Sequence, residues 1–205
     1  MQKKRGTQQR EKKHLSAVGL LSEVRKVFKK IPSTISRNKK VSLTDSLMSA
    51  LAMFSLKSSS LLAFDKSYRT KMTVNNLGSL YGIKHAPSDT YMREELDEVD
   101  PSKLRIAFLS VFKAAQRGKL LEQYNFLGSH LITVDGTGMF NSEKISCENC
   151  CEKHHRNGRT DYYHQVLVSA IAHSDMRQVI PLCPELINKQ DGTLKNDCER
   201  RAMGR

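Results

Sequence analysis

The chain has 205 residues and a mass of 23.3 kDa, enough for one ordinary domain or for a small helical module joined to an incomplete second one. Its formal net charge is +13, and residues 1–40 alone hold +11 of it, so a basic arm precedes a nearly neutral body. No apolar run approaches the roughly 20 residues that cross a bilayer. The spacing of the five Cys does not indicate a disulfide framework, so we expect a soluble intracellular protein and not a membrane or secreted one.

The first 128 residues carry apolar side chains at helical spacing. Ser42-Leu43-Thr44-Asp45 has the form of a capping box, which predicts the start of a helix. Asp100-Pro101 is a favourable cap and first turn for the longest predicted helix. The pattern predicts helices over residues 15–31, from 43, over 73–83 with an end near Gly82, from 87 and from 101.

Past Gly128 the pattern becomes that of strands. Residues 130–134 form an apolar strand that runs into Asp135-Gly136, which we interpret as a turn. Residues 163–172 are apolar on both faces, which is typical of a central strand. A third strand is predicted over 178–183, and a helix begins over 197–203.

Asp135 is the first candidate functional residue. A strand that delivers a carboxylate to its end, followed by two small residues, exposes that carboxylate at the rim of a sheet. Divalent cations such as Mg²⁺ prefer hard oxygen ligands of this kind. The alternative is that Asp-Gly is only a turn.

A Cys/His cluster is the second candidate. Cys147, Cys150, His154 and His155 offer thiolates and imidazoles that could surround a tetrahedral Zn²⁺. All four lie in one short segment, whereas dependable zinc signatures have two ligand pairs about a dozen residues apart. The alternative is a polar turn, and on this spacing we expect no stoichiometric zinc.

Basic side chains near the N-terminus are the third candidate. At this density they neutralise phosphates and release counterions, which predicts salt-sensitive, sequence-independent binding to DNA or RNA. The alternatives are a solvated tail, or contact of the amphipathic helix over 15–31 with an acidic membrane surface. The DNA-binding candidates are Lys3, Lys4, Arg5, Arg10, Lys12, Lys13, Arg25, Lys26, Lys29 and Lys30.

Five motifs follow one another along the chain: LMSALAMFSLKSSSLLAF (Leu47–Phe64), PSDTYMREELDEVD (Pro87–Asp100), LITVDGTGMF (Leu131–Phe140), CENCCEKHHRNG from Cys147 and KQDGTLKNDCER from Lys189. In this order they resemble motifs of DDE transposases of bacterial insertion sequences. The resemblance extends over most of residues 40–200, and the number and order of the motifs make it specific.

The resemblance implies an α+β fold in which a helical N-terminal region precedes an incomplete RNase H-like mixed α/β domain. It divides the chain into a basic arm with the first helix (1–40), a helical DNA-binding region (41–128) and a partial catalytic domain (129–205). In this family two Asp and one Glu hold two Mg²⁺ ions for strand cleavage and transfer. Asp135 matches the first carboxylate, as catalytic residue and metal ligand.

The second Asp and the Glu have no counterpart in this sequence, and the family pattern continues past the segment at Asp197–Glu199. We therefore expect a truncated transposase of DNA transposition that binds transposon ends but is catalytically inactive on its own. The resemblance further implies a cytoplasmic, nucleoid-associated location and a homo-oligomer. The alternative is a non-catalytic DNA-binding protein or a zinc-stabilised nucleic-acid-binding regulator.

Overall fold

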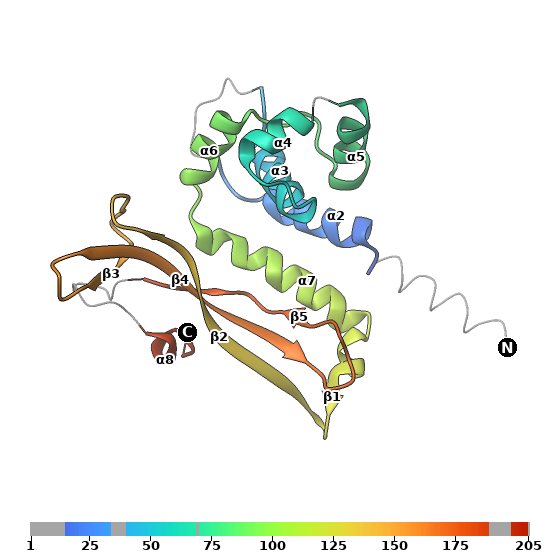
Figure 1. Cartoon of the computed structure of the whole chain (residues 1–205). Coiled ribbons are helices and arrows are strands. Elements are labelled where there is room, and N and C mark those ends of the chain that lie inside the picture. The colour runs from blue at the N-terminus through green and yellow to red at the C-terminus, as the bar shows by residue number, and fades with distance from the viewer. Residues whose placement is uncertain (1–14, 34–39, 69, 189–197, 205) are drawn as a thin grey trace. The chain divides into compact units, whose positions relative to one another are not determined.

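The computed structural model describes residues 15–33, 40–68, 70–188 and 198–204 (Figure 1). The chain forms two compact units, a helical unit over Met1–Leu120 and a β unit over Leu121–Arg205. All but two short helices lie in the first unit and an antiparallel sheet in the second, so the chain is an α+β protein, as the sequence predicts.

Most helices of the helical unit begin at a Ser or Thr whose hydroxyl accepts a hydrogen bond from a backbone N–H three residues later. Ser42 accepts from the Asp45 N–H at 3.1 Å, which confirms the predicted cap. Gly82 ends its helix in the left-handed conformation, as predicted. The elements are α2 (Ala17–Phe28), α3 (Leu43–Ser55), α4 (Leu61–Ser67), α5 (Lys71–Tyr81), α6 (Asp89–Asp97), the 3₁₀ helix η1 (Pro101–Leu104) and α7 (Arg105–Arg117).

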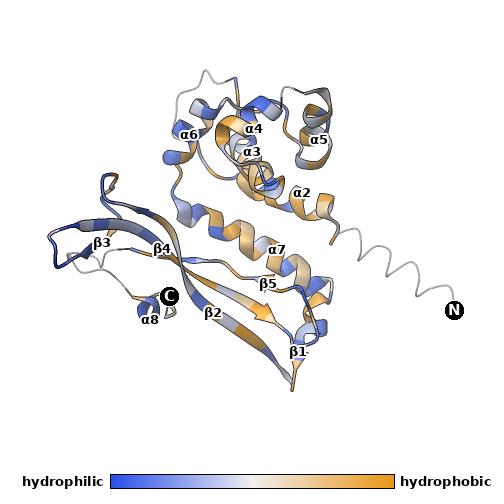
Figure 2. Cartoon of the chain, in the orientation of Figure 1, coloured by the Kyte–Doolittle hydropathy of each residue, from blue (hydrophilic) through white to orange (hydrophobic). Residues whose placement is uncertain are grey.

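The core of the helical unit is built from the apolar stripes of these helices. Met48 from α3, Phe64 from α4 and Met92 from α6 are completely buried. Val27 and Phe28 of α2 belong to the same core, so the first helix is part of the folded unit. The apolar residues of α2 and α3 are orange in Figure 2. No helix in the described part of the chain is both long and apolar enough to cross a membrane.

The β unit is built around one long central strand. β4 pairs with β2 along one edge and with β3, β6 and β5 in succession along the other, and every pairing is antiparallel. The central position predicted for residues 163–172 is confirmed. The elements are η2 (Leu120–Tyr124), β1 (Asn125–Phe126), β2 (Ser129–Ser142), β3 (Cys151–His154), β4 (Thr160–Ala172), β5 (Ile180–Pro181), β6 (Glu185–Ile187) and α8 (Glu199–Ala202).

Two sequence predictions about this sheet are corrected by the structure. Asp135-Gly136 is not a turn, because β2 continues through it to Ser142 and Asp135 pairs with Val168 of β4. The local Asp-Gly signal yields to the backbone hydrogen bonds that the partner strand supplies. The third strand is only β5, since the nearby prolines cannot donate to a ladder. The predicted helix over 197–203 is α8, and residue 197 lies outside the described residues.

The two faces of the sheet differ in what covers them within the β unit. Leu167 of β4 packs with Cys151, Ile187 and Ala202, which places α8 against its face. Side chains alternate between faces along a strand, so His164 and Val168 lie on the opposite face. Because Asp135 pairs directly with Val168, the Asp135 carboxylate lies on that opposite face too. We call this opposite side of the sheet the Asp135 face.

Candidate functional site

Asp135 is exposed in the middle of β2. Its cross-strand partner is Val168, and the neighbouring pairs on the same face join Thr133 to Ala170 and Thr137 to Val166. These neighbours are apolar or carry hydroxyl groups. The carboxylate that the resemblance implies as a metal ligand is therefore accessible, but the side chains around it carry no negative charge.

Glu199 of α8 lies against the opposite face of the sheet from Asp135. A Cβ placed on Gly136 would lie 2.0 Å from Glu199 Oε1, so this carboxylate rests directly against the glycine. Gln165 donates to Glu199 Oε1 at 3.0 Å. Asp135 and Gly136 are adjacent in a strand, so the Asp135 side chain points to one face of the sheet and a Cβ on Gly136 would point to the other. The sheet itself separates Glu199 from Asp135.

Of the acidic residues late in the sequence, none that the structure describes completes a site with Asp135. Glu185 begins β6, on the far side of β4 from β2, and Asp191 and Asp197 lie outside the described residues. Among the residues that the structure describes, no cluster of three metal-ligating side chains includes Asp135. Asp135 therefore offers one hard ligand, and the surroundings described here do not fit an Mg²⁺ pair.

The described residues contain one cluster with metal-ligand chemistry, made by Cys147, Cys150 and His164. The two Sγ atoms are 3.6 Å apart, and His164 Nε2 lies 3.3 Å from Cys147 Sγ and 3.4 Å from Cys150 Sγ. The thiols come from a turn before β3, closed by a hydrogen bond from the Cys150 N–H to the Cys147 carbonyl. The imidazole comes from β4, on the Asp135 face.

The two histidines that the sequence paired with these thiols lie elsewhere. His154 Nδ1 is 3.0 Å from Thr160 Oγ1, and His155 Nε2 is 3.0 Å from a carboxylate oxygen of Asp161. Sequence adjacency was misleading because β3 carries these rings away from the turn. His164 was missed, although its spacing of fourteen positions after Cys150 is the signal that could have found it.

Asp161 is the centre of a small polar network. Arg159 donates to it through Nε at 2.9 Å and through Nη2 at 3.3 Å. Hydrogen bonds from Arg159 and from His155 lower the pKa of the Asp161 carboxyl to about 2. His155 is thus engaged in fixing the β3–β4 connection and is not available to the thiol cluster.

The basic candidates fall into three groups. Arg25 donates through Nη2 to Asp45 Oδ1 at 2.7 Å in a largely buried pair, so this guanidinium has a structural partner within the helical unit. Lys26 pairs with Glu23 at 2.7 Å but stays exposed, and Lys29 and Lys30 are exposed at the end of α2. The remaining six, from Lys3 to Lys13, lie outside the described residues.

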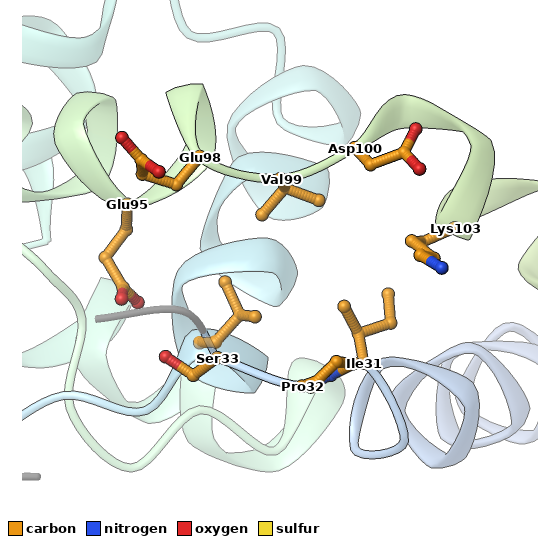
Figure 3. A pocket seen from close by; sticks show the side chains of 9 residues that line it. Ile31, Pro32, Ser33, Glu95, Glu98, Val99, Asp100 and Lys103 are labelled. Atoms are coloured by element: carbon orange, nitrogen blue, oxygen red, sulfur yellow. The ribbon is translucent and has the colours of Figure 1, made fainter. Parts of the chain in front are cut away.

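A small pocket of about 90 Å³ lies in the helical unit. Figure 3 shows Ile31 and Val99 on opposite sides of it, with the carboxyl groups of Glu98 and Asp100 near its rim. Buried Glu95 accepts a hydrogen bond from Ser46 at 3.4 Å. The volume is that of a few water molecules, so the pocket does not fit a nucleotide or a cofactor.

Comparison with models of known protein families, with curated proteins and with solved structures found no match to this chain. Functional assignment therefore rests on the residues themselves. Three features are relevant to it: the exposed Asp135, the exposed lysines of α2 and the Cys/His cluster.

Proposed function

We propose that the protein is a DNA-binding chain of the transposase kind, in which the helical unit and the basic residues before it bind duplex DNA. The β unit would be RNase H-like and would carry Asp135 as a metal-binding carboxylate. The observation that carries this proposal is Asp135 itself, an exposed carboxylate in the middle of β2, with Val168 of β4 as its cross-strand partner.

The distribution of positive charge supports the DNA-binding part. Lys29 and Lys30 are exposed at the C-terminal end of α2, and six further cations precede that helix in the sequence. Arg25 is excluded from this set because Asp45 neutralises it. The exposed cations would contact phosphate oxygens, which gives affinity without sequence specificity.

DNA cleavage is not proposed for this chain by itself. Two divalent ions bring four positive charges to one site, and several carboxylates must offset them at ligand distance. Asp135 supplies one, and Glu199 faces the other side of the sheet. The family resemblance thus supports an inherited site, whereas the described residues around Asp135 supply too few carboxylates for catalysis.

DNA binding is tested by removing charge while keeping α2 intact. Deletion of residues 1–40 would remove Val27 and Phe28 from the core, so the informative variants are deletion of residues 1–14 and the double substitution Lys29→Gln with Lys30→Gln. We expect weaker binding to a duplex in both. The slope of log K against log salt should flatten by up to about 5 for the deletion and about 2 for the substitutions.

The matched control removes two exposed lysines from the β unit, as Lys144→Gln with Lys153→Gln. It changes the net charge by the same amount as the α2 pair and should leave the salt slope nearly unchanged. Equal weakening by both pairs would mean that only the net charge matters. Unchanged binding in the deletion and in the α2 pair would overturn the proposal.

Catalysis is tested with a supercoiled plasmid and Mg²⁺ or Mn²⁺. We expect no nicking, with Asp135→Ala as the control for contaminating nuclease. Nicking by the parent chain that disappears in Asp135→Ala would show that other carboxylates complete the site. That result would replace the binding-only assignment with an active nuclease.

A further inference from the structure

Three metal-ligating side chains from two separate segments converge on the Asp135 face of the sheet. Cys147 and Cys150 belong to the turn before β3, and His164 belongs to β4, fourteen positions after Cys150. Each of the three atoms Cys147 Sγ, Cys150 Sγ and His164 Nε2 lies within 3.6 Å of the other two. The two cysteines are close because they are three positions apart in one turn. The histidine joins them because β4 runs antiparallel to β3 and passes beside that turn.

The triangle has the dimensions of one face of a zinc tetrahedron. Zinc bonds of about 2.3 Å to sulfur and about 2.05 Å to nitrogen, at tetrahedral angles, place two sulfurs about 3.8 Å apart and sulfur and nitrogen about 3.6 Å apart. The observed separations are 3.6 Å between sulfurs and 3.3 and 3.4 Å from sulfur to nitrogen. Shifts of a few tenths of an ångström would complete the geometry.

A disulfide is a different outcome for the same two cysteines. A disulfide requires sulfurs about 2.05 Å apart, well below the 3.6 Å found for Cys147 and Cys150. A disulfide would also not account for the position of His164 beside both sulfurs. The Cys147 N–H donates to Cys150 Sγ at 3.3 Å, which holds the two residues together in the turn.

Cys150 and Cys151 are adjacent in the sequence, but only Cys150 belongs to the Cys/His cluster. The Cys151 thiol donates to the Ile187 carbonyl at 3.4 Å within the core on the α8 face. Cys150, in contrast, joins the exposed Cys147 and the half-buried His164 on the other side. One face of the cluster is therefore open to solvent.

We propose that Cys147, Cys150 and His164 bind one Zn²⁺ ion, with the fourth position taken by water on the exposed side of Cys147. The ion would tie the turn before β3 to the central strand β4. It would lie about 13 Å along β4 from the partner of Asp135, which is too far to share a ligand with that carboxylate. The site is independent of the proposed DNA binding.

The experiment uses the full chain, purified with a thiol reductant, loaded with Zn²⁺ and dialysed against metal-free buffer. Metal analysis should return about one zinc per chain. Replacement by Co²⁺ should give the intense d–d absorption of a tetrahedral site together with thiolate-to-cobalt charge transfer. Metal binding should release protons as the thiols ionise.

Cys147→Ser and His164→Asn should each reduce bound zinc to near zero. The matched controls are Cys198→Ser, a second exposed cysteine, and His154→Asn, the exposed histidine of the same motif, and both should keep full stoichiometry. His164→Cys should restore the cobalt spectrum with stronger charge transfer. Far-ultraviolet circular dichroism confirms that each variant is folded.

Four results would overturn the proposal. Three concern zinc: absence of bound zinc in the reduced parent chain, retention of full stoichiometry in folded His164→Asn, and loss of zinc in the His154→Asn control. The fourth is a Cys147–Cys150 disulfide that forms despite the reductant. None of these results depends on whether the chain binds DNA, so the two proposals fail separately.

Discussion

The two units of the protein bury their apolar side chains to different extents. The helical unit has a continuous core of a dozen buried residues, among them Met48 and Phe64. The described residues of the β unit have a main buried cluster of only four, formed by Cys151, Leu167, Ile187 and Ala202. Apolar side chains of β2, including Leu131 and Ile132, are about half exposed.

This difference follows from how helices and strands find partners. A helix satisfies its own backbone and needs only one apolar stripe covered, which neighbouring helices supply. The β2–β4 pair has two faces, and within the β unit α8 packs against the face that carries Leu167. Figure 2 shows a second contrast, because the part of the pair near β1 is apolar and the part near β3 is hydrophilic. The Cys/His cluster lies toward the hydrophilic end.

The largest expected loss of stability comes from a substitution in the better-packed core of the helical unit. Phe64 is completely buried, so Phe64→Ala should lower the free energy of unfolding of the helical unit by about 3–5 kcal/mol. Phe126→Ala in the β unit removes the same atoms from a side chain that is 43% exposed, and should cost about 1 kcal/mol or less. Denaturant unfolding of both variants measures the contrast. Equal losses would mean that the β unit is as well packed as the helical one.

The next effect concerns a buried charge in the helical unit. Arg25→Ala leaves Asp45, only 4% exposed, without its cationic partner, and should cost about 3 kcal/mol. Lys26→Ala breaks an exposed pair with Glu23 and should cost about 0.5 kcal/mol or less. Thermal unfolding at neutral pH compares them. A small loss for Arg25→Ala would show that Asp45 gains other partners.

A smaller effect tests how α8 is attached to the sheet. Gly136→Ala places a Cβ within 2.0 Å of Glu199 Oε1, so Glu199 must move and its hydrogen bond from Gln165 is lost. We expect a cost of about 1 kcal/mol, seen as faster amide exchange in α8. Gly138→Ala is the matched control, since a Cβ there meets nothing within 4 Å. Identical behaviour of the two variants would mean that α8 is not held by this contact.

The smallest effect at neutral pH becomes visible in acid. The pKa of Asp161 in the folded chain is about 2, whereas an unfolded Asp titrates near about 3.9. Between these values the unfolded state binds more protons, so stability contributed by Asp161 is complete above pH about 4 and is lost as the pH falls toward about 2. Asp161→Asn should flatten the stability profile in that window, and Asp175→Asn, an exposed control, should not. If Asp161→Asn leaves the slope of stability against pH unchanged, the hydrogen bonds of Asp161 do not contribute to the loss of stability in acid.

Helix positions could be predicted from the sequence because their signals are local. Ser42, Ser88 and Gly82 each act within one helical turn, so the sequence near each residue is enough. The central strand was also predictable, since both faces of β4 are apolar. Strand length was not, because pairing with β4 carried β2 through Asp135-Gly136 to Ser142.

The candidate sites divide in the same way. The sequence by itself determined that Asp135 follows an apolar strand, that residues 1–40 hold +11 of the +13 net charge and that Cys147 and Cys150 lie in one short segment. Only the tertiary structure decided that Arg25 belongs to Asp45, that Glu199 is on the wrong face for Asp135 and that His164 completes the thiol cluster. These three contacts join residues far apart in the chain, and their geometry depends on helix packing and strand register, which no local pattern encodes.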